Sequence, residues 1–112
     1  MQIDGVGAQL GNYLSYLVRR QEVVASNIAN VDTPGYQARD VAAPADFSAA
    51  LGNASSVFEV SGLVSHNDGN NVSIDRESRI LAENDLRFNV ATQLLRGEVK
   101  QIREAIQEGR SS

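Results

Sequence analysis

The carboxy-terminal third of the chain carries the pattern that most limits the possible folds. In "SIDRESRILAENDLRFNVATQLLRGEVKQIREAIQEG" one apolar residue recurs every seven positions, at Ile74, Leu81, Phe88, Leu95 and Ile102. A seven-residue apolar repeat lines one edge of an α-helix and is typical of a helix that pairs with another helix. Acidic and basic residues balance over the remaining positions, many of them four residues apart. The pattern predicts a long, solvated helix over about residues 75–108.

Residues with capping chemistry mark both ends of this helix. Ser73 or Asp75 can accept a hydrogen bond from a free N–H group of the first turn, and Gly109 suits the stop. Asn84 lies near the apolar edge, where an asparagine fixes the register of a helix pair at some cost in stability.

A second amphipathic segment lies near the amino terminus. Its apolar residues are three, four or seven positions apart, at Leu10, Leu14, Leu17, Val24, Ile28 and Val31. This spacing predicts a helix over about residues 8–30. Arg20 and Gln21 interrupt the stripe, which favours pairing with another helix over burial in a globular core.

Two asparagines, Asn27 and Asn30, stand at the end of the first helix. One interpretation is a polar position in the helix pair together with a residue that tolerates the geometry of a helix end. The other is that both asparagines fix the register and the number of partners, as Asn84 would in the second helix. The sequence leaves both open.

The helix is followed by a sharp turn, "DTPGY". Pro34 presets φ for the second turn position and Gly35 accepts positive φ at the third, which predicts a type II turn. Thr33, which precedes the proline, is pushed away from helical geometry. The turn is either an ordinary helix terminator or a contact loop that presents Tyr36 and Arg39 to a neighbouring molecule.

The 112 residues suffice for a single domain, and we predict that residues 1–112 form one. Residues 31–72 are rich in Ala, Ser, Gly and Asn and show no sustained period, so we expect a turn and a largely irregular linker. "VFEVSGLV" leaves room for a short extended stretch, and Asp68–Gly69 is a turn signal. The expected fold class is all-α, with the two terminal helices paired as an α-helical coiled coil.

The composition gives little support to chemistry at a site. The net charge is −4, Trp is absent and aromatic residues make up 5%, so a nucleic-acid partner is not expected. There is no cysteine, and the single histidine, His66, has no second ligand at metal-binding spacing. We therefore expect no catalytic, cofactor or metal site and no enzyme activity. We also expect no membrane span and no cleavable signal peptide.

Two stretches resemble a known family. "VASNIANVDTPGYQARD" is similar to the amino-terminal signature of the bacterial flagellar rod, hook and hook-associated axial proteins. "DGNNVSIDRESRILAENDLRFNVATQLLRGEVKQIREAI" resembles the carboxy-terminal region of the proximal rod proteins of that assembly. The two motifs occur in the expected order, whereas the middle, residues 41–67, looks short for the family.

The resemblance implies a structural subunit of the basal body rod, which transmits torque from the rotor ring to the hook. It implies partners as well: further copies of the chain, other proximal rod proteins, the rod-to-ring adaptor and the membrane rotor ring protein. Passage through the flagellar type III export apparatus and assembly in the periplasmic space are also implied. On this basis the expected subunit-interface residues are Asn27, Ile28, Asn30, Thr33, Pro34, Gly35, Tyr36, Arg39, Leu81, Asn84, Phe88, Leu95 and Ile102.

From the heptads alone, a cytoplasmic helical-hairpin adaptor or chaperone is the alternative. It would form a discrete oligomer rather than a polymer, and it leaves the "DTPGY" turn unexplained. For the rod subunit, a marginal helix pair would be only partly ordered as a monomer and would gain helix on packing.

Overall fold

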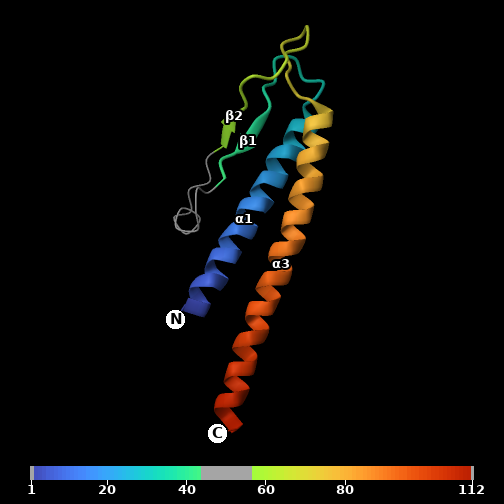
Figure 1. Ribbon diagram of the computed structural model, residues 1–112. Helices are drawn as coiled ribbons and strands as arrows, with labels where there is room; N and C mark the ends of the chain where they lie inside the picture. Colours follow the sequence, from blue (N-terminus) through green and yellow to red (C-terminus); the bar gives the residue numbers. More distant parts are fainter. Residues whose placement is uncertain (1, 44–56, 112) are drawn as a thin grey trace.

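Two long antiparallel helices form the frame of the molecule (Figure 1). The computed structural model describes residues 2–43 and 57–111. Helix α1 spans Gln2–Ala29 and helix α3 spans Ile74–Ser111. The molecule measures 71 × 23 × 16 Å, and its radius of gyration is 18.6 Å, against about 13 Å for a compact domain of this length. The predicted all-α hairpin with a distinct middle segment is confirmed.

Both helices are longer than the sequence patterns suggested. Helix α1 begins six residues before the predicted start at residue 8, and α3 continues through Gly109, which was the expected stop. Ser73 is the N-cap of α3, because its Oγ accepts a hydrogen bond from the Arg76 N–H at 3.2 Å. The acidic residues Asp75 and Glu77 follow in the first turn, where the helix dipole favours negative charge.

A small antiparallel sheet flanks the helix pair beside α1 (Figure 1). Strand β1, Arg39–Val41, pairs with strand β2, Val57–Glu59, so that Asp40 lies opposite Phe58. Strand β2 lies at the start of the extended stretch expected around "VFEVSGLV". Strand β1 was not predicted, and the segment that joins the two strands lies outside the described residues.

The apolar core is small and lies between α1 and β1. Tyr16, Leu17 and Val41 form its centre, and Tyr13 and Val23 pack against them half-buried. Leu17 and Val24 are almost fully enclosed because α3 covers the other side of α1. Strand β1 therefore completes a core that the helix pair leaves open.

The buried line of α3 differs from the predicted heptad line. Along the first half of α3 the centre of the interface is occupied by Glu77, Ile80, Asn84 and Ala91, all buried. Of the predicted line, Leu81 is only half-buried and Phe88 is 38% exposed. An unsupercoiled helix turns by about 20° per heptad relative to a strict seven-residue repeat, so such a line drifts from the centre of an interface to its edge.

Candidate functional site

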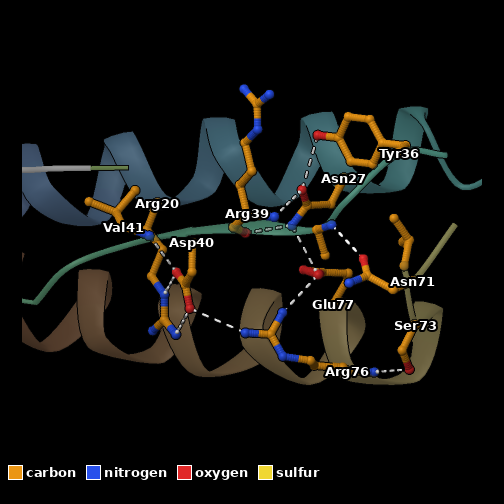
Figure 2. A network of polar contacts seen from close by, with 12 residues as sticks. Arg20, Asn27, Tyr36, Arg39, Asp40, Val41, Asn71, Ser73, Arg76 and Glu77 are labelled. Atoms are coloured by element: carbon orange, nitrogen blue, oxygen red, sulfur yellow. Dashed lines mark hydrogen bonds and ion pairs between the residues drawn. The ribbon is translucent and has the colours of Figure 1, made fainter. Parts of the chain in front are cut away.

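The feature with the most interactions is a buried polar cluster where α1, β1 and α3 meet. We call it the polar junction and define it as Arg20, Asn27, Asp40, Arg76 and Glu77 (Figure 2). Its residues come from three elements that are far apart in the sequence. The junction therefore fixes how the elements sit against one another.

Asn27 is the centre of the junction and is fully buried. Its Nδ2 donates to the backbone carbonyl of Arg39 at 2.7 Å and to Glu77 Oε1 at 3.0 Å. Its Oδ1 accepts from the Arg39 N–H at 3.0 Å and from Tyr36 Oη at 3.2 Å. The amide thus pairs with both backbone groups of Arg39, as a neighbouring strand would, and also ties α1 to α3.

Asp40 carries the ionic part of the junction (Figure 2). Arg20 of α1 donates to both carboxylate oxygens of Asp40, with Nε to Oδ1 at 2.9 Å and Nη2 to Oδ2 at 3.2 Å. Arg76 of α3 reaches Asp40 Oδ2 at 3.3 Å. The side chain that interrupts the apolar stripe of α1, Arg20, therefore has a structural partner on β1.

Burial and ion pairing shift the two junction carboxylates in opposite directions. Burial raises the pKa of Asp40, but hydrogen bonds from Arg20 and the Val41 N–H, with the charges of Arg20 and Arg76, bring that pKa below its ordinary value. Burial raises the pKa of Glu77 above its ordinary value, because the Arg76 charge and the hydrogen bonds from Asn27 and Arg76 only partly oppose it. Glu77 Oε2 is buried without a hydrogen-bond partner.

The predicted turn follows directly from α1. Gly35 has φ of +75°, and the Tyr36 N–H donates to the Thr33 carbonyl at 3.2 Å, as expected of a type II turn. Asn70 holds the turn from outside, since its Nδ2 donates to the carbonyls of Asn30 and Thr33, each at 2.8 Å. The turn thus has tertiary contacts with the segment before α3 and does more than terminate α1.

A second asparagine in the same stretch, Asn71, fixes the chain between the turn and β1. Its Oδ1 accepts from the Ala38 N–H at 2.6 Å, and its Nδ2 donates to Gln37 Oε1 at 2.9 Å. Gly69 has φ of +84°, in agreement with the turn predicted at Asp68–Gly69. The "DGNN" segment therefore positions the end of the helical hairpin.

The structure gives the two seam asparagines of α1 different roles. Asn27 contacts Glu77 of the same chain. Asn30 lies at the helix end, where its Nδ2 donates to the Ser26 carbonyl at 2.8 Å and its Oδ1 accepts from Thr33 Oγ1 at 3.0 Å. Asn30 therefore takes the helix-end role, whereas Asn27 joins the two helices.

The other expected interface residues fall into two groups. Thr33, Pro34, Gly35 and Arg39 are exposed at the closed end of the hairpin, and half-buried Tyr36 also approaches Ser26, its Oη lying 3.3 Å from Ser26 Oγ. Along the helices, Asn84 is buried and donates to the Leu17 carbonyl at 2.8 Å, whereas Phe88 is exposed. The remaining expected residues are half-buried: Ile28, Leu81, Leu95 and Ile102. Of these residues, the structure joins Asn27 with Tyr36 and the Arg39 backbone, and Asn30 with Thr33 beside the turn.

Sequence reasoning missed most of the polar junction. Asp40 lies in a segment without helical period, and Glu77 is one of the charged residues that the seven-residue pattern leaves off the apolar edge of the second helix. The one available signal was Arg20, because a long basic side chain within an apolar stripe requires a nearby acid when it is half-buried.

Apolar side chains also remain exposed along α3. Leu86, Val90 and Leu94, which we call the apolar strip, recur every four residues and are 65%, 50% and 58% exposed. Together with Leu10 and Tyr13 of α1 they line a groove of about 360 Å³. Among the described residues, Arg87 is the only charged one that lines it.

A second groove, of about 300 Å³, lies between the same helices and is lined in part by Leu17, Val18 and Phe88. Glu22 and Asp85 also line it. Within residues 2–43 and 57–111, no cluster of His, Asp or Glu has the composition of a metal site, and no helix is long and apolar enough to cross a membrane.

Comparisons with known proteins agree on one family. A family model described as flagella basal body rod protein matches residues 14–37, which include Asn27 and the whole of the turn. Among curated proteins, the flagellar basal body rod protein FlgB of Yersinia enterocolitica is 31% identical, over 96% of this chain and 98% of the relative. That alignment extends over 138 positions, more than the 112 residues of this chain.

Two further FlgB proteins are similar to this chain as well. The protein of Escherichia coli K12 is 32% identical, over 86% of this chain and 88% of the relative. The protein of Bacillus subtilis 168 is 29% identical, over 96% of this chain and 97% of the relative. The similarity therefore includes both helices and the turn rather than one motif.

Proposed function

The chain belongs to the flagellar basal body rod protein family and is a structural subunit of the bacterial flagellar rod; from this premise we propose that it polymerises through its two terminal helices. In that role each subunit passes torque from the rotor ring toward the hook. Because the family is a structural one, the work of the chain is mechanical, and the helices carry the load along the long dimension of the subunit.

The apolar strip is the observation that carries this proposal. Exposed apolar rows on a solvated helix mark surfaces that bind another protein. Full burial of one Leu or Val side chain contributes about 1.5–3 kcal/mol of favourable free energy. A helix of a neighbouring subunit that covers Leu86, Val90 and Leu94 would therefore bind with a substantial favourable free energy. Heterologous contacts of this kind propagate into an open helical polymer.

The partners follow from the family in coarse outline, as the other proteins of the rod. We propose in addition that this chain contacts the other proximal rod proteins, the rod-to-ring adaptor and the rotor ring protein, and that it passes through the flagellar type III export apparatus. The exposed turn at Thr33, Pro34 and Gly35 would meet a neighbour at the closed end of the hairpin.

Three polar substitutions on the apolar strip test the proposal. Leu86→Gln, Val90→Gln and Leu94→Gln, combined in a strain that lacks the native gene, should remove the chain from purified basal bodies and abolish swimming, while export continues. The matched control is Gln93→Ala, an exposed polar position on the same helix, which should assemble normally. Normal incorporation of the triple variant would show that the strip is not the assembly surface.

A further inference from the structure

The free end of α3 carries an ordered row of basic and apolar side chains. Asn27 faces Glu77 and Asn84 faces Leu17, so antiparallel helices place the start of α1 near residue 100, and about 10 residues of α3, roughly 15 Å, extend beyond it. Figure 1 shows this extension past the amino-terminal end of α1. No other described element accompanies α3 there.

Within and just before this extension, five exposed residues lie three or four positions apart and share one side of the helix. We call them the arginine stripe: Arg96, Val99, Arg103, Ile106 and Arg110. Among the described residues, none of the three arginines forms an ion pair. The stripe combines positive charge with aliphatic surface, so it suits a groove with an apolar floor and acidic edges.

The second groove has this complementary character. Its floor includes Leu17, Val18 and Phe88, and the carboxylates of Glu22 and Asp85 flank it. Glu22 already pairs with Arg19 at 3.5 Å, but in the described part of the chain Asp85 has no ion pair. The free negative charge of the groove is therefore centred on Asp85.

The groove and the stripe lie on the same side of α3, because Asp85 and Phe88 continue the three-and-four spacing that leads to Arg96. In two copies related by a small rotation, the groove of one copy and the arginine stripe of the other would face the same direction, so these two surfaces could not contact each other. A two-fold axis perpendicular to α3 turns one copy over. It then brings the stripe of each copy to the groove of the other.

We propose that the free subunit forms an antiparallel two-fold dimer in which the arginine stripe of each copy occupies the second groove of the other. Asp85 lies opposite Arg103 of the second copy, the two-fold axis crosses α3 at the level of residue 94, and Phe88 packs beside Val99. The other carboxylate of the groove, Glu22, then lies toward the Arg110 end of the stripe.

This dimer belongs to the subunit before assembly. A two-fold contact is closed and cannot extend, whereas a rod built from heterologous contacts has all its subunits pointing the same way. The apolar strip lies on the opposite edge of the helix pair and stays free, so the proposal is independent of the rod contacts proposed above. It rests on the family assignment only for the statement that the dimer must open on assembly.

The absence of cysteine from the chain permits a direct test by disulfide trapping. Full-length Asp85→Cys and Arg103→Cys chains are mixed and oxidised, and the 85–103 heterodimer should exceed either homodimer. The matched control replaces Arg103→Cys by Glu104→Cys, which is exposed but lies outside the stripe. Equal yields from the two mixtures would overturn the proposal.

Charge reversal in solution provides a second test. Sedimentation of the full chain should show a monomer–dimer equilibrium, and Asp85→Arg or Arg103→Glu should each weaken it by roughly 3- to 10-fold. The double variant should restore most of the lost affinity. A monomer at all concentrations, open-ended oligomers, or a double variant weaker than both single variants would overturn the dimer. Incorporation into basal bodies, tested with the apolar strip, would still decide the proposed function separately.

Discussion

Asn27 shows how much one side chain contributes to this fold. A buried amide usually leaves part of its hydrogen-bonding capacity unused, but Asn27 has two donor bonds and two acceptor bonds, all within the chain. Two of the four satisfy the backbone of Arg39, which would otherwise be an unpaired strand edge beside α1. The asparagine at the polar end of the apolar stripe therefore takes the place of a neighbouring β-strand for Arg39.

Removing this amide should be costly. Asn27→Ala removes the side-chain partners of both Arg39 backbone groups and leaves Glu77 Oε1 with the hydrogen bond from Arg76 alone. We expect a loss of about 2–4 kcal/mol in the free energy of unfolding. Asn30→Ala, at the same helix end but only half-buried, should cost about 1 kcal/mol or less. Urea denaturation of both variants measures the difference, and equal losses would contradict the central role of Asn27.

The two junction carboxylates predict opposite responses to acid. The pKa of Glu77 is raised in the folded state, so its contribution is fully present below the unfolded pKa and is lost as the pH rises through the folded value. The pKa of Asp40 is lowered, so its contribution is present above the unfolded pKa and is lost as the pH falls through the folded value. The free energy of unfolding of Glu77→Gln, relative to that of the native chain, should therefore be higher at about pH 7 than at about pH 4.

Urea denaturation of the native chain and Glu77→Gln at the two pH values checks this. Asp40→Asn is the control, because it leaves Arg20 and Arg76 without their carboxylate and should lose more stability near pH 7 than in acid. If the difference between Glu77→Gln and the native chain were independent of pH, the carboxyl of Glu77 would have no raised pKa.

Among the secondary structure elements, the helices and the position of strand β2 were predictable, whereas strand β1 and its pairing with β2 were not. Apolar periodicity located both helices because each must bury one side against the other. It pointed to the wrong line of α3, because the row through Leu81 is apolar whereas the buried row contains Glu77 and Asn84. The polar row is the buried one because α1 presents polar partners to it, and these contacts are non-local. Strand β1 depends on Asn27 and has no period of its own.

The turn that ends α1 can be tested as an element. Gly35 has φ of +75°, a region that a β-branched residue avoids. Gly35→Val should therefore strain the backbone of the turn at a cost of about 1–3 kcal/mol. We expect motility and incorporation into basal bodies to fall more than export does. Asp32→Ala is the matched control at the same end of α1, where the side chain is exposed. Normal swimming of Gly35→Val would remove the turn from the assembly mechanism.

The whole molecule is an elongated helical hairpin whose tertiary contacts are concentrated toward its closed end. The polar junction, the apolar core and the turn all lie toward the closed end of the hairpin, whereas the other end of α3 extends past the amino-terminal end of α1 (Figure 1). Helices without tertiary packing are marginal in water, so the stability of α3 should decrease along its length. Such a subunit has one fixed end and one end that depends on its neighbours.

Amide hydrogen exchange on the dilute, monomeric chain should reveal this gradient. Protection should be highest where α1 faces the start of α3, around Asn27 and Asn84, and should fall by at least about tenfold toward Val99–Arg110, because opening there breaks few tertiary contacts. Assembly should raise protection mainly in that distal region, and helicity measured by circular dichroism should rise with it. Uniform protection along α3 in the monomer would mean that the free subunit is rigid throughout, and its open end would then not need a neighbour to become ordered.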